Sequence, residues 1–164
     1  MEIIHRDPHT CLRYAEAADT PLILEFIRGL AEYEHLLEMM EATEAGLRKA
    51  LFEDRRAEVL ICEYQGQPAG FALYFYTFST FLGKPGIYIE DLFVKPELRG
   101  KGLGKLLLSA IARRAVEERC GRLEWACLNW NEPSIAFYRR CGARPLDEWT
   151  TYRLTGEKLR ELAD

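Results

Sequence analysis

A glycine-rich turn between an apolar strand and a long helix is the segment of this sequence best suited to bind a ligand. From Val94 to Lys105 the segment reads VKPELRGKGLGK. Glycines let the backbone approach a ligand closely, and their N–H groups can point toward an anion. The positive end of the following helix dipole and the side chains of Arg99 and Lys105 add positive charge. The turn therefore predicts a phosphate or pyrophosphate site.

Two better-known anion-binding motifs do not fit this turn. A P-loop requires Gly-x-x-x-x-Gly-Lys followed by Ser or Thr, whereas Gly104 and Lys105 are followed by Leu106. A dinucleotide fingerprint requires Gly-x-Gly-x-x-Gly in an early turn and an acidic residue at the end of the next strand. Here the spacing is Gly-x-Gly-x-Gly past the middle of the chain, and Glu124 lies inside a strand.

Two adjacent carboxylates, Glu90 and Asp91, lie in the apolar strand before the turn. Strand alternation predicts that Ile89, Asp91 and Phe93 share one face and that Glu90 lies on the other. Charges in an apolar strand are unfavourable unless something uses them, so the pair can bind a cation and accept its proton. The alternatives are an ion pair between Asp91 and a helical arginine, and a solvent-facing Glu90.

A polar helix face follows further along the chain. Asn131, Ser134 and Tyr138 are separated by three and four residues, so on a helix they share one side. The phenol of Tyr138 can donate a proton or a hydrogen bond. The alternative is a half-buried tyrosine whose hydroxyl satisfies a contact in the core.

Together these segments resemble the GCN5-related N-acetyltransferases (GNAT). The Arg-x-x-Gly-x-Gly pattern of residues 99–104 is similar to the acetyl-CoA signature of that family. Residues 88–94, 129–138 and 30–34 resemble the branch of diamine acetyltransferases, which includes the spermidine/spermine and thialysine N-acetyltransferases. The resemblance implies an N-acetyltransferase that uses acetyl-CoA as acetyl donor and a small-molecule primary amine as acceptor.

Acetyl transfer from a thioester requires a deprotonated amine, a stabilised carbonyl oxygen and protonation of the leaving thiolate. In line with the family, we expect direct attack by the amine, with Glu90 as base, directly or through a water, and Tyr138 as acid. The N–H groups of Leu92, Phe93 and Val94 are expected to hydrogen-bond the acetyl carbonyl and pantetheine. The resemblance also implies cofactor contacts at Arg99, Gly100, Lys101, Gly102, Leu103, Gly104, Lys105, Asn131, Glu132, Pro133 and Ser134.

The acceptor positions are implied by the resemblance and carry alternatives. Besides Glu90 and Asp91, residues expected to line the acceptor pocket are Tyr33, Glu34, Glu124, Trp125 and Ala126. Tyr33 and Glu34 are otherwise an ordinary solvent-facing helix end, and Trp125 is otherwise a core residue.

The loop after the second hairpin strand departs from the polyamine-acetylating members, which carry an acidic residue and a tryptophan there. This chain has Ser79 and Thr80 followed by Phe81. Loss of a desolvated carboxylate partner weakens binding of a long polyamine by about 1–3 kcal/mol. The two hydroxyls resemble the thialysine-acetylating relatives and can bind an amino-acid head group. We therefore expect a thialysine-like or lysine-like amino acid or a diamine as substrate.

The elements that position these residues follow from the pattern of apolar residues and turns. The sequence predicts strands at Leu12–Tyr14, Val59–Tyr64, Ala69–Tyr76, Ile87–Val94, Arg122–Leu128 and Thr150–Leu154, and helices after Asp19, after Thr43, from Gly102 and at Pro133–Cys141, with a loop at Thr77–Gly86. The order resembles the GNAT three-layer α/β sandwich, with helices on both faces of a mixed central sheet. In that family the sheet is splayed between the fourth and fifth strands, which a right-handed crossover makes parallel.

Composition limits the remaining possibilities. The 164 residues, 48% apolar and without a linker, predict a single N-acetyltransferase domain over residues 1–164. The five scattered cysteines fit a cytoplasmic protein, the three histidines form no metal set, and no segment suits a signal peptide or membrane span. A net charge of −4 argues against a nucleic-acid partner. The resemblance implies a homodimer. The competing functions are peptide N-terminal acetylation and a non-catalytic acetyl-CoA-binding regulatory module.

Overall fold

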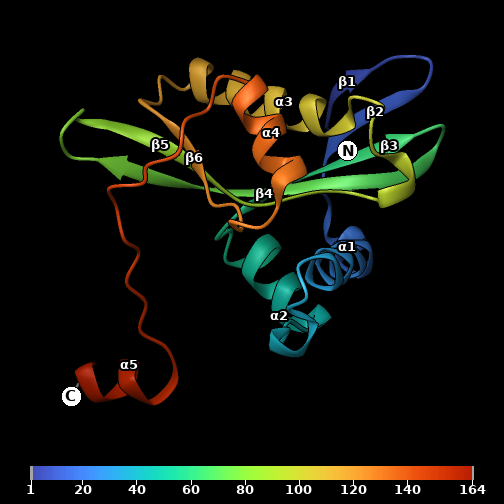
Figure 1. Cartoon of the computed structure of the whole chain (residues 1–164). Coiled ribbons are helices and arrows are strands. Elements are labelled where there is room, and N and C mark those ends of the chain that lie inside the picture. Colours follow the sequence, from blue (N-terminus) through green and yellow to red (C-terminus); the bar gives the residue numbers. More distant parts are fainter. Residues whose placement is uncertain (1, 164) are drawn as a thin grey trace. The chain divides into compact units, whose positions relative to one another are not determined.

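The computed structural model describes residues 2–163 of the chain (Figure 1). The chain divides into two compact units, Met1–Ala126 and Cys127–Asp164, which are described separately. The organisation as one domain stays a prediction. Across residues 2–163, no helix has the length and apolar character needed to cross a membrane.

The first unit is built on a six-stranded sheet in the order β1-β2-β3-β4-β5-β6. Every neighbouring pair is antiparallel except β5 and β6, which are parallel. The mixed sheet predicted from the sequence is therefore confirmed. The strands are β1 (Ile3–Arg6), β2 (Thr10–Tyr14), β3 (Glu58–Tyr64), β4 (Gln67–Ser79), β5 (Lys84–Val94) and β6 (Leu123–Trp125).

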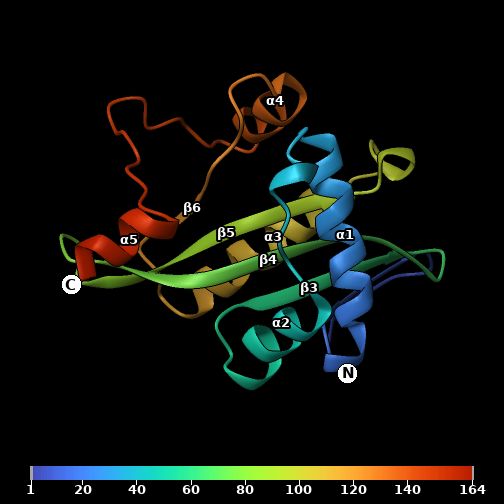
Figure 2. The same ribbon diagram turned by 90° about the horizontal axis from the view of Figure 1, so that it is seen from below.

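Helices cover both faces of this sheet (Figures 1 and 2). Helices α1 (Thr20–Tyr33) and α2 (Glu44–Arg48) lie on one face, and α3 (Leu103–Glu117) lies on the other. Helix α1 begins after Asp19 with a proline in its first turn, as its sequence predicts. Helix α2 begins after Thr43, whose hydroxyl accepts the N–H of Gly46 at 3.1 Å, and continues into a π-helical turn.

The apolar core fills the space between α1, α2 and the sheet. Phe26 of α1 stacks on Phe71 of β4, with ring centroids 5.4 Å apart, and both side chains are fully buried. On the opposite face α3 buries Leu107 and Ile111 completely. The members of the α1 cluster are Ile23, Phe26, Leu51, Val59, Ile61, Phe71, Leu73 and Phe93.

The hairpin between β4 and β5 is longer than the sequence predicted. The expected loop at residues 77–86 is mostly strand, because cross-strand pairing continues out to Ser79 and Lys84. The outer side chains Tyr76 and Phe78 are 42% and 62% exposed. Burial does alternate here, because Phe75 and Thr77 are half-buried and Ser79 is buried, but aromatic side chains occupy the exposed positions and hydroxyl side chains occupy inner ones, so the residue types do not show the alternation that indicates a strand.

The second unit contains α4 (Glu132–Arg140) and α5 (Gly156–Ala163). Helix α4 ends at Arg140, and Gly142 shortly after it has the left-handed φ of 87° typical of such positions. The predicted strand at residues 150–154 is wrong, because the described residues of this unit form no strand. Tyr152 is 92% exposed, so this segment buries no side-chain face that would define a strand register.

Candidate active site

The glycine turn after β5 leaves a row of backbone donors open. Gly100 and Gly102 have φ values of 78° and 83°, a left-handed conformation that other residues adopt only with strain. Between Gly100 and Lys105, no N–H donates a backbone hydrogen bond within the described residues. A Cβ atom built on Gly100 or Gly102 meets no atom within 4 Å. The turn and the start of α3 therefore fit an anionic group such as a pyrophosphate.

Two basic side chains of the turn lie over aromatic rings. The guanidinium carbon of Arg99 lies 4.2 Å from the ring centroid of Tyr33, and its Nε donates to the Val94 carbonyl at 3.1 Å. The Nζ of Lys101 lies 5.3 Å from the ring centroid of Tyr64. These contacts position both cations from within the chain.

A β-bulge interrupts β5 at Glu90. Leu73 of β4 lies opposite Asp91, and the next residue, Tyr74, lies opposite Ile89, so Glu90 is an extra residue without a direct cross-strand partner. The bulge shifts the alternation of side chains by one position. The prediction that Ile89 and Asp91 share a face is therefore wrong.

Because of the bulge, Ile89 and Asp91 lie on opposite faces of the sheet. Asp91 and Phe93 lie on the side of α1, where Phe93 packs against Phe26 with ring centroids 6.2 Å apart. Ile89 lies on the side of α3, because its partner Tyr74 borders a cavity with residues of that helix. A bulge thus aims Asp91 toward the end of α1 and leaves Glu90 exposed.

The parallel pairing of β5 with β6 ends where the bulge begins. Ile89 opposite Trp125 is the last pair, and β5 continues to Val94 beyond the end of β6. The edge of β5 that faced β6 is thereby released from the ladder. This separation fits the splay expected between the fourth and fifth predicted strands.

The released edge presents two N–H groups. Lys95 donates its N–H to the Ala69 carbonyl of β4 at 2.9 Å. Because hydrogen-bonded and non-bonded pairs alternate in an antiparallel ladder, the N–H of Phe93 also faces β4. The N–H groups of Leu92 and Val94 point to the released edge. Of the three donors predicted for the acetyl group, these two are available.

The carboxyl group of Asp91 beside this edge is affected by burial and by two other carboxylates. Burial, followed by the charges of Glu90 and Glu34, raises the pKa of the half-buried Asp91 from its ordinary value of 3.8 to about 7. Burial also raises the pKa of Glu34, which follows the last residue of α1. Carboxylates in this arrangement favour a bound cation, because a positive charge relieves both burial and mutual repulsion.

The raised pKa of Asp91 makes stability depend on pH. Between about pH 4 and pH 7 the folded protein holds a proton that the unfolded chain releases, so the free energy of unfolding falls as pH rises through this window. Asp91→Asn removes this dependence. We expect the variant to match the wild type at about pH 4 and to exceed it by about 2–4 kcal/mol at about pH 8. Urea unfolding at several pH values measures this, and parallel curves would contradict it.

The other first-unit residues that the sequence predicts to bind the acceptor lie in or next to β6 and at the tip of the β4–β5 hairpin. Glu124 lies opposite Tyr88 and forms an ion pair with Arg122 at 2.8 Å, while Trp125 is half-buried and Ala126 exposed. Glu124 and Trp125 belong to β6, which pairs with β5 up to the bulge, and Ala126 follows that strand.

Ser79 and Thr80 lie at the tip of the β4–β5 hairpin. Ser79 is buried, and its hydroxyl accepts the N–H of Leu82 at 3.3 Å, which stabilises the turn. Leu73, opposite Asp91, stands six residues earlier in β4, a separation of about 20 Å along a strand. Within one chain, the structure does not bring the two hydroxyls to the carboxylates.

In the second unit, Asn131 has a structural task that the sequence did not reveal. Its buried side chain accepts the N–H of Ser134 at 3.4 Å and caps α4. Asn131 therefore stands before the helix, while Ser134 and Tyr138 lie on it, four residues apart. Tyr138 is half-buried, with its ring centroid 5.2 Å from that of Phe137. Glu132 and Pro133 form the exposed first turn.

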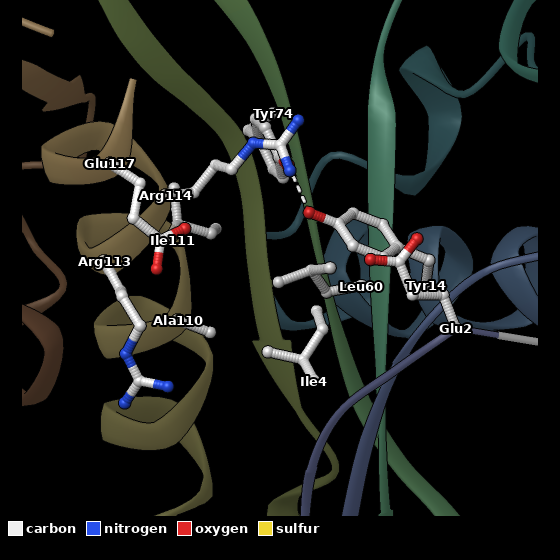
Figure 3. A pocket seen from close by; sticks show the side chains of 10 residues that line it. All are labelled: Glu2, Ile4, Tyr14, Leu60, Tyr74, Ala110, Ile111, Arg113, Arg114 and Glu117. Atoms are coloured by element: carbon white, nitrogen blue, oxygen red, sulfur yellow. Dashed lines mark hydrogen bonds between the residues drawn. The ribbon is translucent and has the colours of Figure 1, made fainter. Parts of the chain in front are cut away.

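A cavity of about 210 Å³ lies on the α3 face of the first unit (Figure 3). Its wall includes fully buried Tyr74, whose hydroxyl donates to Glu58 at 2.6 Å and lies 3.3 Å from the hydroxyl of Tyr14. Burial and these hydrogen bonds raise the pKa of Tyr74 above its usual range. The ten lining residues include none that the sequence predicted for the site. This cavity is separate from the carboxylates and the glycine turn.

The comparisons with known proteins agree with this geometry. Residues 22–143 match the acetyltransferase (GNAT) family. The chain is 37% identical to a thialysine N-epsilon-acetyltransferase of Sus scrofa, covering 93% of this chain and 96% of the relative. It is 32% identical to an L-ornithine N5-acetyltransferase of Arabidopsis thaliana, covering 92% and 86%. Among solved structures, an integron cassette protein from the mobile metagenome of V. cholerae superposes with a TM-score of 0.78 at 28% identity, covering 94% of this chain and 97% of that one.

The chain thus belongs to the GNAT family of acetyltransferases. It is an N-acetyltransferase whose acetyl donor is acetyl-CoA. The predictions of family, fold, enzyme class and cofactor are confirmed.

Proposed function

We propose that this enzyme acetylates the primary amine of a small molecule, either a thialysine-like or lysine-like amino acid or a diamine. The observation that carries the proposal is Asp91, whose carboxyl group is buried near the charges of Glu90 and Glu34, an arrangement that favours an ammonium ligand. Relatives named for thialysine and ornithine support it, because both molecules end in a side-chain amine.

Each part of the site has a role in this proposal. The glycine turn and the start of α3 hold the pyrophosphate of acetyl-CoA, which supplies the acetyl thioester. Of the other predicted cofactor contacts, Asn131 and Ser134 lie at the start of α4 with Glu132 and Pro133 between them. Asp91 and Glu34 hold the amine, and the half-buried ring of Tyr33 lies beside them.

Proton transfer follows from the residue types. Glu90 accepts the proton of the attacking ammonium, directly or through a water, so that the nitrogen lone pair can attack. The N–H groups of Leu92 and Val94 stabilise the negative charge on the carbonyl oxygen. Tyr138 gives a proton to the departing sulfur. The amide product is neutral at the acetylated nitrogen and therefore binds the carboxylates less tightly than the ammonium did.

The wider organisation belongs to the same proposal. A single domain over residues 1–164 is supported by the family match, which spans parts of both compact units. A cytoplasmic location is supported by the free thiols of all five cysteines. A homodimer is supported by the exposed apolar side chains at the β4–β5 tip, where Phe78 is 62% and Phe81 99% exposed. Sedimentation equilibrium would then give about twice 19.0 kDa.

A panel of acceptors tests the function. Purified protein is incubated with acetyl-CoA and with thialysine, lysine, ornithine, putrescine, spermidine or a peptide with a free N-terminus, and thiol release is measured. We expect the amino acids and putrescine to have the highest kcat/KM. A preference for spermidine would overturn the proposed substrate class. Turnover confined to the peptide would replace it with peptide acetylation, and acetyl-CoA binding without turnover of any amine would indicate a regulatory module.

A further inference from the structure

We propose that Arg99 is a positioning residue, which fixes the amine-binding end of α1 to the end of β5 and does not bind the pyrophosphate. The proposal deepens the proposed function and rests on it. It assigns the first residue of the Arg-x-x-Gly-x-Gly pattern to the acceptor side of the reaction.

Two contacts hold the guanidinium of Arg99, one at its Nε and one at the face of the group. Its Nε donates to the Val94 carbonyl at 3.1 Å, and the guanidinium carbon lies 4.2 Å from the ring centroid of Tyr33. A planar guanidinium can stack on a ring through its face and donate a directed hydrogen bond from its edge at the same time, which an ammonium group cannot.

The two contacts join the elements that carry the reacting groups. Val94 ends β5, and its N–H is one of the two donors on the released edge. Tyr33 ends α1, and the next residue is Glu34, whose charge acts on Asp91. Arg99 therefore sets how Glu34 and Asp91 face each other.

The last turn of α1 has few other contacts of this kind. The last fully buried side chain of the helix is Phe26, and close approach to β5 continues to Gly29, where an added Cβ would lie 2.9 Å from the Phe93 ring. Leu30 and Tyr33 beyond that point are half-buried. The stacking contact with Arg99 therefore restrains the last turn of α1. The apolar core holds only the beginning of that turn.

Two variants separate positioning from phosphate binding. Arg99→Gln keeps a hydrogen-bond donor but removes the charge and the stacking, and Tyr33→Leu removes the ring without touching the glycine turn. For each we expect KM of the amine to rise about fivefold to tenfold, with the Kd of CoA from titration calorimetry unchanged within about twofold. Tyr33→Phe, which keeps the ring, should raise KM of the amine less than Tyr33→Leu does.

The double variant tests whether the two residues act as one unit. If they do, Arg99→Gln combined with Tyr33→Leu raises KM no further than either change alone, whereas independent effects would multiply. A Kd for CoA raised about tenfold by Arg99→Gln, with KM of the amine unchanged, would assign Arg99 to the phosphate and overturn the proposal. Multiplying effects would overturn it as well.

A measurement that does not depend on turnover keeps this test valid even if the proposed function is wrong. Releasing the end of α1 should move Glu34 away from Asp91 and lower the pKa of Asp91, which is measured from its carboxyl carbon by NMR in both variants. An unchanged titration would contradict the proposal even if no acceptor were known. Failure of the wild type to bind CoA would instead contradict the proposed function. Circular dichroism establishes that each variant is folded.

Discussion

Replacing Tyr138 with phenylalanine will slow acetyl transfer by about 100-fold or more, while acetyl-CoA binds with nearly unchanged affinity. The change removes one hydroxyl and keeps the ring that packs beside Phe137. Without a proton donor the departing thiolate leaves as an anion, and loss of a positioned general acid has a cost of about 10²–10⁴ in rate. Single-turnover measurement of thiol release gives the chemical step, and titration calorimetry gives the affinity.

Tyr152→Phe is the matched control for this experiment. Tyr152 belongs to the same compact unit, is 92% exposed, and loses the same hydroxyl in the variant. We expect wild-type rates from it. Equal rates for Tyr138→Phe and the wild type would remove Tyr138 from the mechanism and leave solvent as the proton donor.

The parts of the site that depend on local sequence were predictable. The glycine turn follows from the residues between Arg99 and Lys105, because left-handed φ values and a helix start have direct sequence signals. The sheet with a parallel last pair follows from the order of strands and the crossover helix α3. Each of these features needs only neighbouring residues or a general rule of connection.

The parts that depend on pairing between distant segments were not predictable. The bulge at Glu90 exists because Leu73 and Tyr74 pair with residues two apart in β5, and no residue within β5 marks it. As a result, Asp91 shares a face with Phe93 but not with Ile89. This differs from the simple alternation that the sequence predicts. The raised pKa of Asp91 depends first on burial, then on Glu90, and then on Glu34, which is distant in sequence. Tertiary pairing, which short-range patterns do not contain, decides these features.

The helix cap at Asn131 is an intermediate case. A side chain such as Asn before Glu-Pro-Ser is a recognisable helix start, with proline in the first turn. The sequence interpretation placed Asn131 on a helix face because the spacing to Ser134 and Tyr138 fitted. Capping and ligand binding compete for the same amide oxygen, which already accepts the N–H of Ser134.

Replacing Gly102 with alanine will weaken acetyl-CoA binding by about 10-fold to 100-fold. Gly102 has a φ of 83° and stands directly before α3, so an L side chain strains the turn and turns its N–H groups away from a common point. Among the described residues, apart from Gly102 and its two chain neighbours, no atom lies within 4 Å of the added Cβ. The loss must therefore come from the backbone conformation and from the methyl group facing the ligand, and titration calorimetry with CoA measures it.

Gly83→Ala is the matched control, which separates a general loss of stability from a local loss of CoA affinity. Gly83 at the tip of the β4–β5 hairpin also has a positive φ, 60°, and open space around an added Cβ. Both variants should therefore lose a similar free energy of unfolding, about 1 kcal/mol, and only Gly102→Ala should lose affinity for CoA. If the two variants bound CoA equally well, the open N–H groups of the turn would not be the pyrophosphate site. The anion would then have to be held by side chains, and the basic residues over Tyr33 and Tyr64 would be the first to examine.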